Sequence, residues 1–388
     1  MIVSPGSYHS KSSCGYCGGK KSSKSYGFLA YSVTLQEYQD LIDRGFRRSG
    51  TYIYKPDLRG ACCPQYTIRL PVDHFSPTKE HRQCINRFCR SVNPTHDGQG
   101  SKVKTKGKKN HFDLLETVQN AENEKFKTVI EPASFSSEKH KLYQKYQMSV
   151  HGDDEYECDE EQFTRFLCDN PFSDEDVGNN RGAVHQLYYY EGKLIAFGVL
   201  DLLPLCVSSV YFIWDPEWAK LSMGKVASLQ EISLAKSLKL PYYYMGFYIF
   251  SCPKMSYKGQ YHPSELLDPQ FNSSKEPWLP LERFKKVYEE TGKEYITFVE
   301  EQEDANTDNK GIDSDLFKAR VPGVLRPHQL KPDTHRYVLF SLPVMDGQNM
   351  VVPIEALAPE GLGVAKRLIA EFVAAVGTDL AKDSVIQV

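Results

Sequence analysis

The order of apolar segments in the centre of the chain constrains the fold most. Residues 184–190 and 194–200 both have the composition of β-strands, and Glu191-Gly192 between them is a hairpin signal. Residues 207–214 predict a third strand, which ends where Asp215-Pro216 begins. Because short turns join successive strands that lie antiparallel, these three segments predict an antiparallel meander.

A helix and a further strand follow this meander. Residues 224–238 predict a helix, because apolar side chains recur on one face at Val226, Leu229, Ile232 and Ala235. Pro241 ends it, and residues 242–250 are rich in the aromatic residues typical of strands. Helix and strand do not alternate throughout, so the order favours an α+β core of acyltransferase type over a doubly wound sheet.

The 388 residues are enough for two domains. We predict an N-terminal domain over residues 1–95, which contain six of the ten cysteines. Within it we predict a helix at 35–43 and strands at 51–54 and 65–70. Residues 96–110 predict a lysine-rich loop or linker. Residues 111–388 form the larger predicted domain.

The longest apolar stretches, residues 194–200 and 202–207, are too short to cross a bilayer. The opening MIVSPGSYHS lacks the cationic start and apolar run of a signal peptide. We therefore expect a soluble, cytoplasmic protein, with the nucleus as a second compartment. Since the formal net charge is −3, any nucleic-acid site has to be a local basic patch.

One such patch is the loop that carries five lysines and no apolar periodicity. These are Lys102, Lys104, Lys106, Lys108 and Lys109. The segment is read either as a solvated linker or as an arm that contacts phosphates.

Four cysteines have the pattern of a metal site. Cys14 and Cys17 form a C-x-x-C pair, and the adjacent Cys62 and Cys63 can supply two more thiolates. Four thiolates suit Zn²⁺ or an iron–sulfur cluster. The alternative is a free redox dithiol at Cys14/Cys17 and a buried pair at Cys62/Cys63.

Several catalytic motifs are absent from the sequence. There is no G-x-S-x-G, no phosphate-binding G-x-x-x-x-G-K and no G-x-G-x-x-G, which argues against nucleotide hydrolysis and hydride transfer. The predicted core is instead rich in tyrosine, at 242–244 and 248. Such strands either fill a core or line a cleft with hydroxyl groups.

Long runs of this sequence resemble the eukaryotic arginyl-tRNA–protein transferase family in its fungal form. The runs are CGYC at 14–17, LIDRGFRRSGTYIYKP at 41–56, CCPQYTIRL at 62–70, CINRF at 84–88, IAFGVLDLLPLCVSSVYFIWDP at 195–216 and YYYMGFYIFSCPKMSYKGQYHPSELLDP at 242–269. The likeness covers most of residues 1–90 and 140–285.

This resemblance implies a GNAT-like acyltransferase domain beside a cysteine-containing, metal- or cluster-binding N-terminal domain. It also implies arginyl-tRNA as co-substrate and acceptor proteins that begin with Asp, Glu or oxidised Cys. The product would be marked for ubiquitin-dependent degradation in the N-degron pathway. Because the ester of an aminoacyl-tRNA is already activated, the reaction needs no ATP and no protein nucleophile.

Within this scheme we assign roles to residues as hypotheses. For catalysis, we expect a bulged strand edge near Ser208, Ser209 and Tyr211 to bind the oxyanion. Tyr243 and Tyr248 are expected either to relay the proton or to hold the acceptor backbone. For substrate binding, a carboxylate has to hold the arginyl guanidinium and cations have to hold the acidic acceptor. The substrate-binding candidates are Asp201, Glu231, Gln186, Lys254, Lys258, Arg47 and Arg48. Lys225, at the start of the predicted helix, joins the five loop lysines as a tRNA contact.

Two other functions remain open. A coenzyme-A-dependent acetyltransferase would share the fold, but only Ser222-Met-Gly-Lys225 stands where its glycine-rich turn belongs. The second alternative is a non-enzymatic interaction module that a bound metal stabilises, and it would show no arginine transfer.

Overall fold

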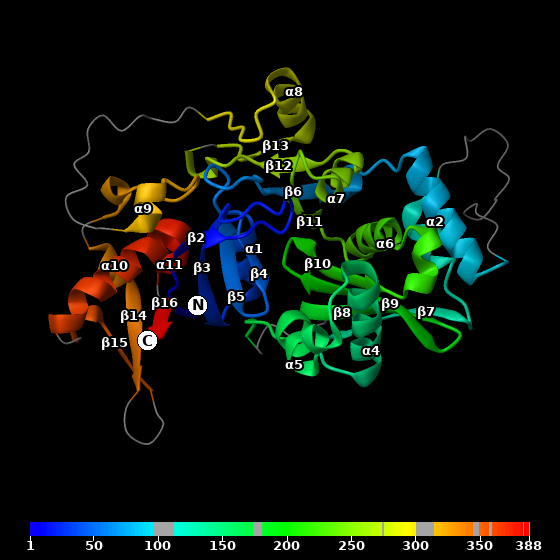
Figure 1. The fold of residues 1–388 in the computed structure, drawn as a ribbon, viewed down its shortest axis with the longest axis horizontal. Helices are drawn as coiled ribbons and strands as arrows, with labels where there is room; N and C mark the ends of the chain where they lie inside the picture. Colours follow the sequence, from blue (N-terminus) through cyan, green and yellow to red (C-terminus); the bar gives the residue numbers. More distant parts are fainter. Residues whose placement is uncertain are drawn as a thin grey trace.

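The computed structural model is a mixed α/β structure that contains two large β-sheets (Figure 1). It describes residues 1–95, 112–173, 181–273, 275–299, 314–331, 333–343, 349–356, 359–382 and 384–387. In these ranges, no helix has the length and apolarity needed to cross a membrane.

The central sheet contains the predicted meander. Its strand order is β13-β12-β6-β11-β10-β9-β8-β7. The bounds are β6 (Tyr66–Pro71), β7 (Phe126–Pro132), β8 (Gly182–Tyr190), β9 (Lys193–Leu202), β10 (Cys206–Trp214), β11 (Tyr242–Tyr248), β12 (Glu265–Leu267) and β13 (Trp278–Pro280). Strands β8, β9 and β10 are antiparallel neighbours, which confirms the meander. Glu191 and Gly192 turn the hairpin with positive φ angles of 49° and 79°, the backbone that two-residue hairpins require.

The helices have the following bounds: α1 (Leu35–Ile42), α2 (Lys79–Val92), α3 (Leu114–Gln119), α4 (Ser137–Tyr146), α5 (Glu160–Phe163), α6 (Met223–Ser237), α7 (Pro253–Ser256), α8 (Leu281–Thr291), α9 (Asp315–Ala319), α10 (Pro359–Val376) and α11 (Thr378–Ala381). Helix α6 packs on one face of the central sheet through the four predicted apolar residues. Helices α4 and α5 cover the other face, where Leu142 and Phe163 join a core with Phe197.

The second sheet joins the two ends of the chain. Its order is β15-β14-β16-β1-β3-β5-β4, and β2 pairs with β3. The bounds are β1 (Ile2–Ser4), β2 (Tyr8–Ser12), β3 (Ser23–Ser32), β4 (Arg47–Ser49), β5 (Tyr52–Pro56), β14 (Val338–Pro343), β15 (Asn349–Val352) and β16 (Ser384–Gln387). Helix α10 packs on this sheet, where Phe372 lies edge-on to Phe28 with ring centroids 5.4 Å apart.

Residues 1–95 therefore contribute to both sheets. Strands β1 to β5 lie in the second sheet, whereas β6 is inserted into the central sheet between β11 and β12. The predicted boundary near residue 95 does not separate one sheet from the other. Independent folding of residues 1–95 stays a prediction.

Candidate active site and four-cysteine centre

An open cavity of about 890 Å³ lies where β10 and β11 diverge. The two parallel strands pair over three residues each, Cys206–Ser208 with Tyr242–Tyr244. Beyond this point both strands continue, and side chains of 209–212 and 245–247 line the cavity. The start of α6 and the segment 254–258 complete its wall.

A β-bulge lies in β10 at the cavity, in the segment where we expected one. The register of β10 against β9 shifts between Ser209 and Tyr211, and Ser208, Ser209 and Tyr211 all line the cavity. A bulge leaves backbone groups outside the strand ladder. Their use as an oxyanion site stays a prediction. The Tyr211 hydroxyl donates a 3.1 Å hydrogen bond to Oε1 of Gln147.

Glu231 is a buried carboxylate on α6 that lines the cavity. Its Oε2 accepts a 2.6 Å hydrogen bond from the hydroxyl of Tyr243 on β11, whereas its Oε1 has no hydrogen-bond partner. Burial raises the pKa of Glu231 to about 7, although the nearby hydroxyls of Tyr243 and Ser209 act in the opposite direction. The site thus holds a buried carboxylate with one oxygen that has no hydrogen-bond partner among the described residues.

Arg47, at the start of β4, places a buried guanidinium in the same cavity. Its Nη1 donates to the carbonyl of Phe46 at 2.8 Å and its Nη2 to that of Gly246 at 3.3 Å, while Nε has no partner. In the part of the chain that the structure describes, no carboxylate forms an ion pair with it. A buried cation without a counter-charge is suited to bind an anionic group.

Two lysines lie beside Arg47 in the cavity wall. Lys258 donates a 2.7 Å hydrogen bond from Nζ to the carbonyl of Phe247, and its burial and the nearby Arg47 lower its pKa to about 7. Lys254 is exposed. Both residues are therefore in the cavity, as expected of groups that meet a substrate.

The start of α6 forms the rim of the cavity. Ser222, Met223, Gly224 and Lys225 line it, and Ser222 has a left-handed backbone with φ 59° and caps no N–H group with its side chain. Lys225 forms an ion pair with Glu80 on α2. The free N–H groups of a helix start attract anions.

The structure adds an aromatic wall that the sequence did not reveal. Trp214 lies edge-on to Tyr146 with centroids 4.5 Å apart and stacks beside Phe212 at 5.9 Å, and all three line the cavity. Tyr146 comes from α4, 68 residues before Trp214 in the chain. Such a wall suits a planar base or an apolar side chain.

The structure corrects the expectation for Asp201 and Arg48. Asp201 is fully buried, and Arg48 binds it bidentately, with Nη2–Oδ1 at 2.5 Å and Nε–Oδ2 at 3.0 Å. Arg48 touches the cavity, but its charge is already neutralised by Asp201. The two predicted substrate contacts thus bind each other.

Two further predicted residues lie away from the cavity. Gln186 is buried in β8, where its Oε1 accepts a 3.0 Å hydrogen bond from Tyr188. Tyr248 is buried edge-on to Phe250, with centroids 5.0 Å apart. Neither side chain lines the cavity, because each belongs to the core around it. The five loop lysines at 102–109 lie outside the described residues.

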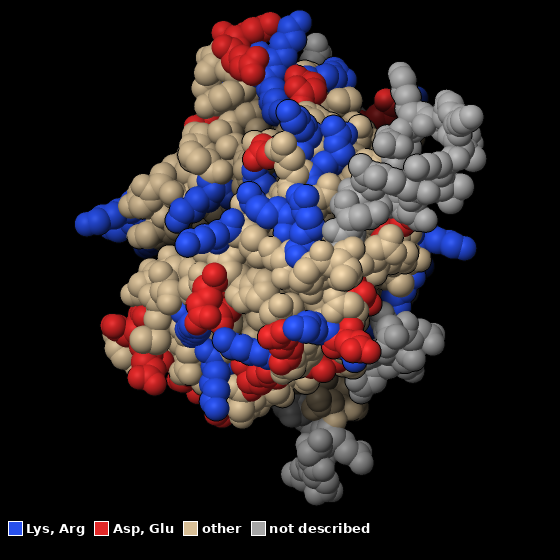
Figure 2. Space-filling view, turned by 90° about the vertical axis from the view of Figure 1, so that its right-hand side faces the viewer, with Lys and Arg blue, Asp and Glu red and all other residues tan. Residues whose placement is uncertain are grey.

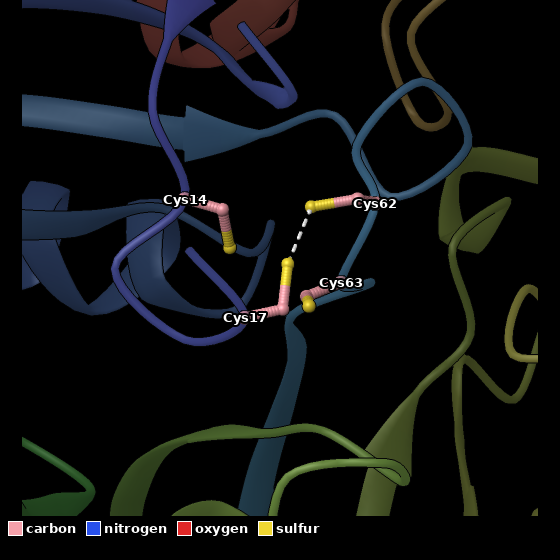
Figure 3. Close-up of side chains that lie close together, drawn as sticks. All are labelled: Cys14, Cys17, Cys62 and Cys63. Carbon is pink, nitrogen blue, oxygen red and sulfur yellow. Dashed lines mark hydrogen bonds between the residues drawn. The ribbon is translucent and has the colours of Figure 1, made fainter. Parts of the chain in front are cut away.

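The four predicted cysteine ligands converge on one point (Figure 3). Their sulfur atoms all lie within 4.8 Å of one another, and Sγ of Cys17 is 3.3 Å from Sγ of Cys62. Cys14 and Cys63 are buried, whereas Cys17 and Cys62 are exposed. The other six cysteines are buried.

This geometry fits a metal ion. Tetrahedral coordination with Zn–S bonds of about 2.3 Å places sulfur atoms about 3.8 Å apart, between the two distances above. Burial alone would raise the pKa of Cys14, but hydrogen bonds from the backbone N–H groups of Cys17 and Tyr16 lower it to about 7. This favours the metal-binding thiolate form at Cys14, whereas burial raises the pKa of Cys62 and Cys63.

The four-cysteine centre adjoins the cavity. Gly15 and Tyr16, between the first two ligands, line the cavity wall. Cys14 and Cys63 also pack with Ile249 and Cys252 just after β11, and Met255 packs against this cluster and lines the cavity. Metal binding at the four cysteines would thus hold one wall of the cavity in place.

The cavity combines the buried carboxylate of Glu231 with the buried guanidinium of Arg47, an arrangement suited to a substrate that carries charges of both signs. Two family models match the sequence: "Arginine-tRNA-protein transferase, N terminus" over residues 12–83 and "Arginine-tRNA-protein transferase, C terminus" over residues 138–268. The chain belongs to the arginine-tRNA–protein transferase family.

Curated relatives agree with this assignment. Arginyl-tRNA–protein transferase 1 of Saccharomyces cerevisiae is 39% identical over 62% of this chain and 51% of the relative, so the chain spans about half the length of the yeast protein. The Drosophila melanogaster transferase of the same name is 32% identical over 72% of this chain and 83% of its own length. An aspartate/glutamate leucyltransferase of Alcanivorax borkumensis is 34% identical over 66% of this chain and 87% of its own length.

Proposed function

We propose that this chain transfers arginine from arginyl-tRNA to the N-terminal α-amine of proteins that begin with Asp, Glu or oxidised Cys. The observation that carries the proposal is the pairing of opposite charges in one cavity, the carboxylate of Glu231 and the guanidinium of Arg47. A guanidinium on the donor and a carboxylate or sulfonate on the acceptor complement these two groups. The arginylated product would enter N-degron degradation in the cytoplasm or nucleus.

On the donor side, Glu231 is the carboxylate for the arginyl side chain. Its Oε1 is without a partner and its Oε2 is fixed by Tyr243, so the carboxylate is oriented before a ligand arrives. Charge-assisted bonds between guanidinium and carboxylate are among the strong ones. Asp201, the other candidate, is already bound to Arg48.

On the acceptor side, Arg47 is the cation for the acidic first residue, with Lys254 beside it at the cavity surface. The acceptor α-amine attacks the ester carbonyl of the arginyl group. A C–N bond forms, the bond to the ribose oxygen breaks, and the amine loses a proton. Lys258, with its pKa near 7, is suited to accept that proton.

The fold of the central sheet is consistent with the GNAT-like architecture proposed for this family. The support is a meander followed by a helix and a parallel strand that separates from its neighbour at a bulge. In coenzyme-A enzymes of that type the start of this helix holds pyrophosphate. Here we propose that it holds the 3′ end of the tRNA, near Lys225.

Transfer of labelled arginine to a synthetic peptide that begins with Asp tests this proposal. We expect labelling with arginyl-tRNA and none when the peptide α-amine is acetylated or Asp is replaced by Ala. Leucyl-tRNA and acetyl-coenzyme A serve as rival donors. Preferential transfer of leucine or acetyl groups, or no transfer at all, would contradict the proposal.

For the four-cysteine centre we propose a single zinc ion. The support is the short sulfur–sulfur spacing, because an iron–sulfur cluster places its own irons and sulfides between the thiolates and needs them farther apart. We expect about one zinc per chain in anaerobically purified protein, loss of this metal in Cys63→Ser, and retention in Cys168→Ser. Stoichiometric iron and sulfide with visible absorption would instead identify a cluster.

A further inference from the structure

Helix α2 has two distinct faces. Its apolar face, which includes Ile85, Phe88 and Val92, is buried in the central core. Four exposed cations lie on the other side: Lys79, Arg82, Arg87 and Arg90. We call these four residues the α2 basic face. Glu80 is the single acidic residue of the helix, and it pairs with Lys225.

This concentration of charge is local. The chain as a whole has a formal net charge of −3. Figure 2 shows the side of the molecule on which α2 lies in Figure 1. Lys and Arg side chains gather across its middle part, whereas Asp and Glu are frequent below them and also lie at the top. A local basic surface on an acidic chain indicates a polyanionic partner.

The α2 basic face leads to the rim of the cavity. Nη2 of Arg87 donates a 3.2 Å hydrogen bond to Oγ of Ser222, which lines the cavity next to Gly224 and Lys225. A chain of anionic groups can therefore run from α2 to the start of α6, past the Glu80–Lys225 ion pair.

The character of the surface favours RNA over an acidic protein. The cations span residues 79–90, about 16 Å along the helix axis, and between them lie the exposed Gln83 and the half-buried Asn86, both polar. Protein interfaces have an apolar or aromatic centre, and this face offers none. Several cations along one polar helix face are typical of contacts to phosphates.

We propose that the α2 basic face binds the sugar–phosphate backbone of the tRNA acceptor end and directs its 3′ terminus to the cavity at the start of α6. This inference rests on the proposed function for the identity of the RNA. It places the main docking surface on a helix in the N-terminal part of the chain, apart from the groups that meet the arginyl residue.

The test measures binding of uncharged, end-labelled tRNA by Arg82→Ala/Arg90→Ala over a range of salt concentrations. Arg87 is left intact because it contacts Ser222. The matched control is Lys366→Ala/Arg367→Ala, which removes two exposed cations from α10 at the opposite end of the molecule. We expect the α2 variant to bind at least about ten-fold more weakly at 0.1 M salt and its salt slope to fall by about 1.5, as for two lost phosphate contacts. The control should match wild type.

Wild-type affinity and slope in the α2 variant would overturn the inference. Equal losses in both double variants would also overturn it, since the effect would then follow total charge. If the variant instead loses binding to an acidic peptide and keeps binding to tRNA, the surface is a protein site. Transfer from arginyl-adenosine, which has no phosphate, should be the same in the variant and wild type.

This last readout separates the inference from the proposed function. Weak tRNA binding by the α2 variant together with no arginine transfer by wild type would support the surface and contradict the function. Arginine transfer by wild type together with unchanged tRNA binding by the variant would support the proposed function and contradict the role of the α2 basic face.

Discussion

The hydroxyl of Tyr243 donates a 2.6 Å hydrogen bond to Oε2 of Glu231, and it leaves Oε1 of the same carboxylate without a partner at the cavity. An unpaired buried carboxylate oxygen is costly unless a ligand satisfies it. The pair therefore orients a binding group for a cation.

Glu231→Gln should weaken binding of arginyl-adenosine by about 2 kcal/mol, or roughly 30-fold. The reason is loss of the charge that faces the guanidinium. Because burial raises the pKa of Glu231 to about 7, wild-type affinity should rise as pH increases through 7, when the carboxylate ionises, and then level off. Calorimetry between pH 6 and 8 checks both effects. The same pH profile in Glu231→Gln would show that another group binds the arginyl side chain.

Tyr243→Phe and Tyr248→Phe form a matched pair in one strand. The first removes the hydrogen bond to Glu231 and should reduce the rate of transfer about ten-fold, because the carboxylate loses its orientation. The second changes a tyrosine that does not line the cavity and should retain the rate. Steady-state kinetics with both variants gives the comparison; equal losses would place Tyr248 in the reaction after all.

Arg47→Lys tests recognition of the acceptor. Lysine keeps a charge but loses the planar donor set, and we expect KM for a peptide that begins with Asp to rise about ten-fold with little change for the donor. Lys254→Ala, an exposed position in the same wall, should have a smaller effect. A larger effect at Lys254 than at Arg47 would assign the acidic group to the cavity surface instead.

The buried Arg48–Asp201 ion pair should contribute to the stability of the fold. Asp201→Asn should lower the free energy of unfolding by about 3–5 kcal/mol, because it leaves a buried guanidinium without its counter-charge. The double variant Arg48→Met/Asp201→Leu should recover much of that loss. Urea unfolding of the single and double variants measures the coupling. Unchanged stability in Asp201→Asn, with loss of arginine binding, would restore the substrate role first assigned to Asp201.

The parts of the fold that depend on neighbouring residues were predictable. The hairpin at Glu191-Gly192 and the apolar face of α6 follow from short-range patterns, whereas the bulged edge of β10 was expected only from the family resemblance. Contacts between distant segments were not. Nothing in the sequence pairs Arg48 with Asp201, 153 residues away, or inserts β6 between β11 and β12.

The same distinction applies to the site. The four-cysteine centre could be predicted because both of its ligand pairs, Cys14/Cys17 and Cys62/Cys63, are close together in the sequence. Helix α2 was missed, since its buried face combines His81, Cys84 and Cys89 with apolar residues and lacks a simple aliphatic repeat. Tyr146 joins the aromatic wall only because α4 packs over β10, which no local pattern shows.

The most direct test of the central claim is an experimental structure of this protein with a non-hydrolysable arginyl-adenosine analogue. The account predicts the arginyl side chain inside the cavity between β10 and β11, with a guanidinium nitrogen about 2.7–3.0 Å from Oε1 of Glu231. The adenosine should lie toward the start of α6, with the space beside Arg47 left free for the acceptor. A guanidinium bound elsewhere, with Oε1 of Glu231 still unpaired, would contradict the account.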